Sequence, residues 1–174
     1  MRRLLLLLLG LLAFAAPARA SELFAGLLAH DIESPLNKGG FESGADLQLG
    51  WRGDRIGALR LLGAPSPYAF ASIATGGETH MAAAGLSWRI GHRLFARPGI
   101  GLAVHTRSSH GVRNGLRTDL GSRVLFEPEL GIGYRLTDRV AIEASWVHVS
   151  HATLFSGQNP GMDGVGIRLS FALR

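Results

Sequence analysis

Apolar residues occupy every second position along much of the chain. The clearest runs lie at residues 82–90, 94–105, 123–136, 140–147 and 165–171. A period of two is typical of β-strands, because successive side chains of a strand point to opposite faces of the sheet. In these runs one face is consistently apolar, whereas the other mixes Arg and Glu with Gly and Ser. The pattern therefore predicts an all-β protein.

Eight strands account for these runs and for weaker ones near the start of the chain. We expect them at residues 22–30, 43–52, 67–76, 79–90, 93–106, 121–136, 138–150 and 163–173. A ninth apolar run, RIGALRLLG at 55–63, is interpreted as a continuation of the second strand beyond an irregularity at Gly53. This interpretation keeps the strand number even, as it is in single-chain bacterial barrels.

The charged second face favours a barrel that crosses a membrane. In such a barrel the apolar face contacts lipid, and with eight strands the polar face fills a narrow interior. Strand lengths of roughly 10–14 residues suit this architecture. The alternative is a secreted soluble β-domain with its apolar face inside, since alternation alone does not say which face is buried. We expect an eight-stranded antiparallel transmembrane β-barrel of the bacterial outer membrane.

The predicted connections also fit such a barrel. Those at 63–66, 91–92 and 137–138 are short, whereas those at 31–42, 107–120 and 151–162 are long. Outer-membrane barrels have short periplasmic turns and longer external loops. Both termini are then expected in the periplasm.

The first 20 residues predict export. The basic start MRR precedes an apolar run at 4–16, and ARA at 18–20 is a small-x-small cleavage site. These are the features of a secretory signal peptide. We expect cleavage after Ala20, and a single barrel domain at 21–174.

Charge and cysteine content argue against nucleic-acid binding and against cysteine-based sites. The formal net charge of +5 falls to +2 after cleavage, because residues 1–20 contain three arginines and no acidic residue. The remaining chain has no basic block that would bind nucleic acid. Cysteine is absent, so neither a disulfide framework nor a thiolate metal site is expected.

Three residues with catalytic chemistry share the outward face near the external ends of the last two strands. His148 and Ser150 continue the apolar row of residues 140–146, and Asp163 begins the row of the final strand. Ser150 would be the nucleophile, His148 the base that accepts its proton, and Asp163 the acid that holds the imidazole. The alternative is a set of polar residues in an interfacial belt, which costs little at that depth.

The stretch VHVSHATLFSGQNPGMD at 147–163 resembles the end of outer-membrane lipid A 3-O-deacylases of the PagL type, also labelled acyloxyacyl hydrolase-like. That family has His-x-Ser-Asn-Ala, then a loop, then Asn-Pro-Gly-x-Glu. The first part matches at His148, Ser150 and Ala152, and the second at Asn159 and Gly161 with the proline between them. Residues 85–90, 97–105 and 121–136 also look like middle strands of the family, and the resemblance covers about residues 67–174.

The resemblance implies a serine esterase without a cofactor. Such an enzyme removes the ester-linked 3-hydroxyacyl chain at the 3-position of lipid A, within the outer leaflet of the membrane. The resemblance also implies catalytic roles for His148 and Ser150, and it places Asn159 and Gly161 in a loop near the site. The implied partners are lipopolysaccharide and the membrane, whereas the oligomeric state, including a homodimer, stays open.

Two residues depart from the family pattern. Asp163 stands where the family has Glu, and is one methylene shorter. His151 stands where the family has an Asn associated with the oxyanion hole. An imidazole can also donate a hydrogen bond, so His151 is the candidate oxyanion donor.

Two other functions stay open at this point. One is a catalytically weak or inactive barrel of the same fold, with a structural or adhesive role. The other is a small lipid-binding barrel, against which the charged luminal residues Arg97, Glu127, Glu129 and Glu143 argue. We also expect loop cations to meet lipid A phosphates, namely Arg107, Arg113 and Arg117.

Overall fold

The computed structural model describes residues 20–37, 42–76, 79–106, 120–154, 157 and 159–173, with side chains from Glu22 onward. The predicted signal peptide therefore lies outside the described residues except for Ala20, at which the first strand begins. No helix among the described residues is long and apolar enough to cross a membrane.

The described chain forms one antiparallel sheet that closes on itself. Its strands are β1 (Ala20–Ala29), β2 (Ala45–Gly53), β3 (Ser66–Ala74), β4 (Met81–Ser87), β5 (Ile90–Gly91), β6 (Leu94–His105), β7 (Val124–Arg135), β8 (Val140–Val149) and β9 (Met162–Ala172). Sequence neighbours pair with each other except β4 and β5, which both pair with β6, and β1 pairs with β9.

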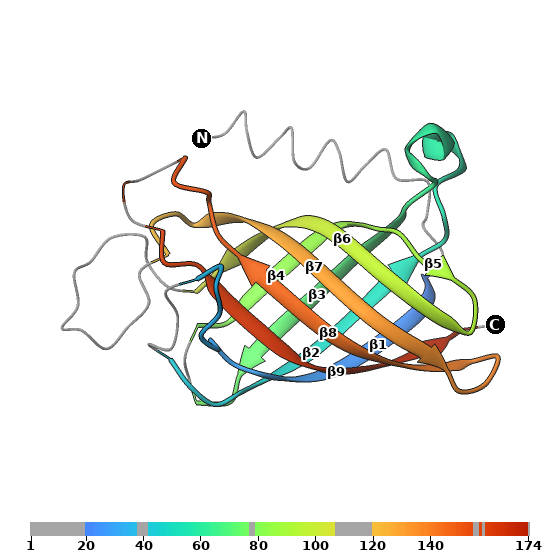
Figure 1. Cartoon of the computed structure of the whole chain (residues 1–174), viewed down its shortest axis with the longest axis horizontal. Coiled ribbons are helices and arrows are strands. Elements are labelled where there is room, and N and C mark those ends of the chain that lie inside the picture. The colour runs from blue at the N-terminus through green and yellow to red at the C-terminus, as the bar shows by residue number, and fades with distance from the viewer. Residues whose placement is uncertain are drawn as a thin grey trace.

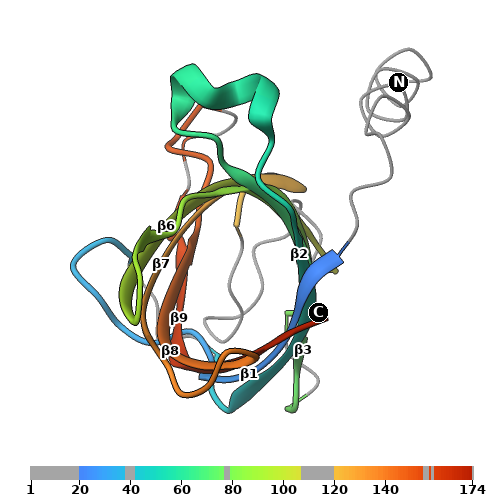
Figure 2. The same ribbon diagram turned by 90° about the vertical axis from the view of Figure 1, so that its right-hand side faces the viewer.

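The nine labelled segments make eight barrel strands, because β4 and β5 are one strand interrupted at Trp88 and Arg89. Figure 2 shows the resulting closed ring of strands. The prediction of an eight-stranded antiparallel barrel is confirmed.

The prediction that residues 55–63 continue the second strand is wrong. β2 ends at Gly53, and a 3-10 helix, η1 (Gly57–Leu62), leads from it toward β3. Gly63 ends the helix in the left-handed conformation (φ +83°) and its N–H donates to the carbonyl oxygen of Arg60. The apolar residues of this run do not alternate, so they have no strand face to form, and the predicted short turn at 63–66 is the end of a longer connection.

The apolar face of the barrel points outward. Large apolar side chains are exposed along the outer wall, among them Leu27, Leu49, Ile100, Ile132 and Ile167. The alternate positions face the interior, where charged side chains such as Glu127, Glu143 and Arg168 are almost completely buried. This is the arrangement of a barrel that lies in lipid, and it rules out the soluble alternative.

Buried ion pairs fill the interior. Arg168 Nη1 lies 2.7 Å from Glu129 Oε2, and Arg97 Nε lies 2.8 Å from Glu143 Oε2. Arg52, which the sequence analysis did not single out, lies 2.9 Å from Glu22 through Nη1. The guanidinium groups of Arg52 and Arg168 also lie over the ring of Phe24. The interior is therefore a packed polar core.

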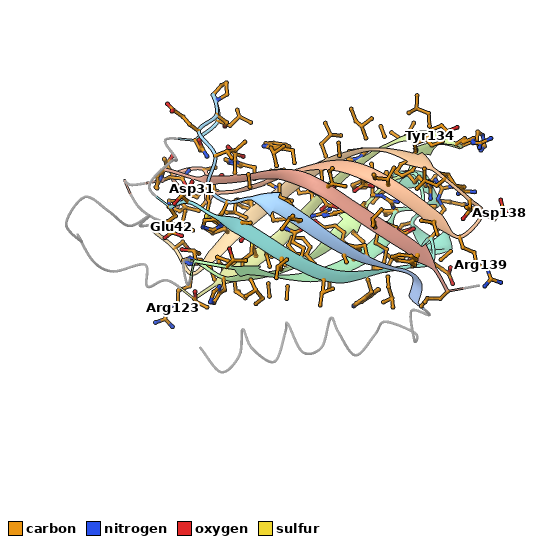
Figure 3. All side chains as sticks on the ribbon, turned by 90° about the horizontal axis from the view of Figure 1, so that it is seen from below. Asp31, Glu42, Arg123, Tyr134, Asp138 and Arg139 are labelled. Carbon is orange, nitrogen blue, oxygen red and sulfur yellow. The ribbon has the colours of Figure 1, made fainter. Side chains whose placement is uncertain are left out.

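The two ends of the barrel differ. We call the end of the barrel with the long connections 30–44, 106–123 and 150–161 the loop end. The opposite end, where β1 begins and β9 ends, is the turn end. Figure 1 shows the C-terminus and the short β5 together at the turn end. In Figure 3, Asp31, Glu42 and Arg123 lie at the loop end, and Tyr134, Asp138 and Arg139 lie at the turn end.

The substitution Glu143→Ala should destabilise the barrel strongly. It removes the carboxylate that lies 2.8 Å from Arg97 and 3.6 Å from Arg52, so that Arg97 keeps only Glu22 among its described ion pairs, and breaking a buried ion pair by removing one partner costs about 3–5 kcal/mol. Urea unfolding in lipid vesicles, followed by the gel shift between folded and unfolded barrel, measures this change. Glu33→Ala, at an exposed loop carboxylate, is the control, and an equal stability of the two variants would contradict the prediction.

Candidate active site

His148 and Asp163 face each other across the pair β8–β9 at the loop end. They are direct cross-strand partners, and His148 Nδ1 lies 2.9 Å from Asp163 Oδ1. Their strand neighbours Val147 and Met162 belong to the interior hydrophobic cluster. Because side chains alternate along a strand, His148 and Asp163 lie on the outer side of the wall, as the alternation predicts.

The carboxylate of Asp163 accepts three hydrogen bonds, two from β8 and one from the connection between β1 and β2. Trp146 Nε1 donates to Oδ1 at 2.8 Å, and Ser34 Oγ donates to Oδ2 at 2.5 Å. An ionised carboxylate only accepts, so the third bond must come from an N–H at His148 Nδ1. A neutral imidazole then has its lone pair on Nε2, which is the form that a general base requires.

Ser150 follows β8 directly and continues the same row. It forms an isolated bridge with Phe126, in which Ser150 N donates to Phe126 O at 3.1 Å and Phe126 N to Ser150 O at 2.7 Å. The described side chains of Ser150 and His148 are not hydrogen-bonded to each other. Hydrogen bonds between a catalytic base and its nucleophile are often long without substrate and tighten when substrate binds.

His148 and Asp163 are covered, although the sequence analysis expected them to face lipid. Their exposed fractions are 8% and 0%. The indole of Trp146 stacks against the imidazole at 6.0 Å between ring centroids. Residues 31–37, in the connection between β1 and β2, cover Asp163, and the backbone N–H of Ile32 donates to its carbonyl oxygen at 2.9 Å. The acid is thus shielded from solvent. Its hydrogen bonds are stronger there than they would be in water, because the local dielectric constant is lower.

The connection between β1 and β2 is anchored by an ionic cluster at its base. His30 lies 2.9 Å from Glu42 and 3.0 Å from Asp46, and Thr79 donates to Glu42 from both its backbone and its side chain. Burial by itself lowers the pKa of His30, but the hydrogen bonds to Asp46 and Glu42 outweigh it and raise the pKa to about 10. His30 is therefore charged at neutral pH, and its partner Glu42 joins this connection to the one between β3 and β4.

Asn159 and His151, which follow β8 in the connection to β9, are joined by a hydrogen bond. The backbone N–H of His151 donates to Asn159 Oδ1 at 3.1 Å, so this N–H is not available to an oxyanion. The side chain of His151 is completely buried. Its role as an oxyanion donor stays a prediction.

Gly161 packs against the imidazole edge. It has the left-handed φ of +70°, and a Cβ at this position would lie 3.0 Å from His148 Cε1 and 3.3 Å from Asn37 Cβ. The glycine that the family motif contains is therefore required here for backbone conformation and for space.

Sequence reasoning missed Ser34 and Trp146. Trp146 stood in the row of His148, so its proximity could have been inferred from alternation, whereas Ser34 has no periodic signal. The loop cations Arg107, Arg113 and Arg117 lie outside the described residues. Within the described part of the chain, no group of three or more His, Asp or Glu side chains could hold a metal ion.

Gly161→Ala should lower turnover by about 10–100-fold through His148, because the new methyl group displaces the imidazole by a few tenths of an ångström. Release of a fatty acid from lipopolysaccharide, the substrate that the sequence resemblance implies, measures this effect in the purified variant. Gly157→Ala is the matched control, since a Cβ there meets nothing within 4 Å. Equal rates of the two variants would show that Gly161 does not constrain the imidazole.

Comparisons with known proteins identify a family and similar structures for this chain. The family described as "Lipid A 3-O-deacylase (PagL)" matches residues 44–172. The crystal structure of the outer membrane enzyme PagL matches with a TM-score of 0.61 and 17% identity, covering 87% of this chain and 99% of that one. The Yersinia pestis outer membrane protein Ail matches with a TM-score of 0.49 and 9% identity, covering 88% of this chain and 99% of that one, which is too distant to carry an argument.

No curated protein sequence matches the chain. The family match nevertheless extends over most of the chain, through every strand from β2 to β9. With the barrel and the resemblance of residues 147–163 already established, the chain belongs to the PagL family of lipid A 3-O-deacylases and is a β-barrel of the bacterial outer membrane.

Proposed function

We propose that this protein is a serine esterase that removes the 3-hydroxyacyl chain esterified at the 3-position of lipid A. The observation that carries the proposal is the buried pair of His148 and Asp163, next to Ser150, in a chain of the lipid A deacylase family. Ser150 is the nucleophile, His148 the general base and then acid, and Asp163 the group that orients the imidazole. The reaction needs no cofactor.

The reaction proceeds in two half-reactions. His148 Nε2 accepts the proton of Ser150 Oγ while Oγ attacks the ester carbonyl carbon. The tetrahedral intermediate collapses, the C–O bond to the sugar breaks, and the imidazolium protonates the departing sugar oxygen. His148 then deprotonates a water molecule, which attacks the acyl-serine carbonyl. The bond to Ser150 Oγ breaks, the imidazolium returns its proton to Oγ, and the 3-hydroxy fatty acid is released. Asp163 keeps its charge throughout and stabilises the imidazolium.

The position of the site fits this substrate. The loop end faces the cell exterior in the proposed orientation, with the signal peptide removed and both termini in the periplasm. Ser150 lies at the external end of β8 on the outer side of the wall, level with the outer leaflet. A lipid A molecule can then present its ester to Ser150 while its acyl chains stay in the membrane.

The two departures from the family pattern affect different steps. Asp163 reaches His148 despite its shorter side chain, because the two residues are direct cross-strand partners. His151 takes the place of the family's Asn and with it the proposed role of oxyanion donor, and its backbone N–H is bound to Asn159. Loss of one oxyanion donor typically lowers the rate about 10²–10³-fold, so the departure at His151 affects stabilisation of the tetrahedral intermediate.

Ser150→Ala should abolish activity without disturbing the barrel. The variant lacks the nucleophile, and removal of the nucleophile from a triad costs about 10⁶-fold in turnover in the best-studied case. Lipid A from Gram-negative cells that produce the wild type should lose the mass of one 3-hydroxyacyl chain, and lipid A from cells with the variant should not. Ser43→Ala, at an exposed serine of the loop end, is the matched control and should be fully active.

The same measurement separates the enzyme from its rival, an inactive structural or adhesive barrel of the same fold. Unchanged lipid A in cells with folded wild-type protein in the outer membrane would favour the rival. Loss of an acyl chain from another position would keep the esterase but contradict the proposed 3-position.

A further inference from the structure

We propose that Ser34 is a fourth member of the relay, a positioning residue that holds the carboxylate of Asp163 from the opposite side to His148. This inference rests on the proposed function, in which Asp163 orients the catalytic imidazole. Ser34 lies 129 positions before Asp163 in the chain, in the connection between β1 and β2.

The hydrogen bonds of Ser34 fix the direction of its hydroxyl group. The backbone N–H of Leu36 donates to Ser34 Oγ at 3.0 Å, which occupies a lone pair of the oxygen. The hydroxyl hydrogen is then directed to Asp163 Oδ2 at 2.5 Å. Hydrogen bonds to an ionised acceptor are stronger than those between neutral groups.

The backbone around Ser34 is held in place before the substrate arrives. Its own N–H donates to Asn37 Oδ1 at 2.9 Å, and Asn37 Nδ2 donates to Ile32 O at 2.9 Å. The N–H of Ile32 in turn donates to the backbone of Asp163 at 2.9 Å. Residues 32–37 therefore form a braced turn that is fastened to β9 at the catalytic acid.

Asp163 needs this third donor. His148 and Trp146 both donate to Oδ1, and without Ser34 the oxygen Oδ2 has no described donor. The residue is completely buried, so water does not solvate this oxygen in place of Ser34. An unsatisfied oxygen favours rotation of the carboxylate, and rotation moves Oδ1 away from the imidazole. Ser34 thus acts on catalysis through Asp163 and does not touch the substrate.

Ser34→Ala should lower kcat about 10–100-fold and leave KM unchanged, since one charge-assisted hydrogen bond is lost away from the substrate. Ser34→Thr keeps the hydroxyl group and should restore most of the rate. Ser43→Ala is the control for a serine of the same loop without a described side-chain contact. The rates are measured with purified, folded protein on lipopolysaccharide micelles, with folding checked by the gel shift.

A double substitution tests whether Ser34 works through the acid. In an Asp163→Asn background, Ser34→Ala should change kcat by less than twofold, because the charged acceptor is already gone. Wild-type kcat in Ser34→Ala, or an undiminished effect of Ser34→Ala in the Asp163→Asn background, would overturn the inference. An active Ser150→Ala would instead refute the proposed function itself, so the two failures are distinguishable.

A second, independent observation concerns η1. We infer that η1 is an interfacial anchor that seats in the phospholipid leaflet at the turn end. Figure 2 shows η1 outside the ring of strands, and Figure 1 shows it at the end that carries β5. Its leucines Leu61 and Leu62 are 94% and 63% exposed, and none of its residues is buried.

The barrel holds η1 firmly in this exposed position. Trp88 Nε1 donates to Leu62 O at 2.6 Å, and Arg55 Nη2 donates to Arg89 O at 3.2 Å. The outer wall beside it is also apolar, with exposed Ile90 and Leu94 at the same end of the barrel. The leucines of η1 therefore extend the lipid-facing surface of the barrel outward. Arg60, in the last turn, supplies a cation for lipid phosphate, as in other interfacial helices.

The absence of cysteine from the sequence allows a direct test. Leu61→Cys is labelled with an environment-sensitive fluorophore and the protein is folded into phosphatidylcholine–phosphatidylglycerol vesicles. The label at position 61 should emit at shorter wavelength and be quenched by spin-labelled phospholipid. Asp54→Cys, in the exposed segment before η1, is the control and should report water. Equal emission and equal quenching of the two labels would overturn the anchor.

Discussion

Closure of the sheet is the constraint on which the rest of this structure depends. A chain that crosses lipid must form hydrogen bonds to every backbone N–H and C=O within itself. The pairing of β4 with β6 closes the sheet, so that no strand edge is left open. Closure also divides the side chains into two environments. The outer row contacts lipid and is apolar, whereas the inner row is sealed in a narrow space and must neutralise its own charges.

The interior solves this problem with interlocked ion pairs. Glu143 lies between Arg97, Arg52 and Arg168, so that each charge faces opposite charges from more than one strand. The resulting core joins β2, β6, β8 and β9 across the lumen and makes a rigid support. Such a support matters for a hydrolase, since the catalytic groups must keep their relative positions within a fraction of an ångström.

The candidate site is built on this support but not inside it. The cross-strand pairing of His148 with Asp163 sets the distance between base and acid, and the strands that carry them are rigid. A loop fastened by His30, Glu42 and Asp46 then covers the acid from the lipid side and supplies Ser34. The acid is buried on the outside of the barrel, where a substrate that stays in the membrane can still reach the neighbouring Ser150. Burial of the acid and access for a lipid are thus reconciled by one covering loop.

Alternation alone determined the eight strands and the row that contains His148 and Asp163. It succeeded there because a strand leaves each side chain only two directions, and a closed barrel makes one of them lipid and the other a polar core. It failed at residues 57–62, where no alternation exists and a glycine in a left-handed conformation ends a helical turn. It also gave no sign of Ser34, whose contact with Asp163 spans 129 positions and depends on how an irregular loop folds back onto β9. The alternation of a strand can be read from consecutive residues. The path of a loop depends instead on hydrogen bonds to groups that are distant in sequence and that only the closed barrel brings within reach.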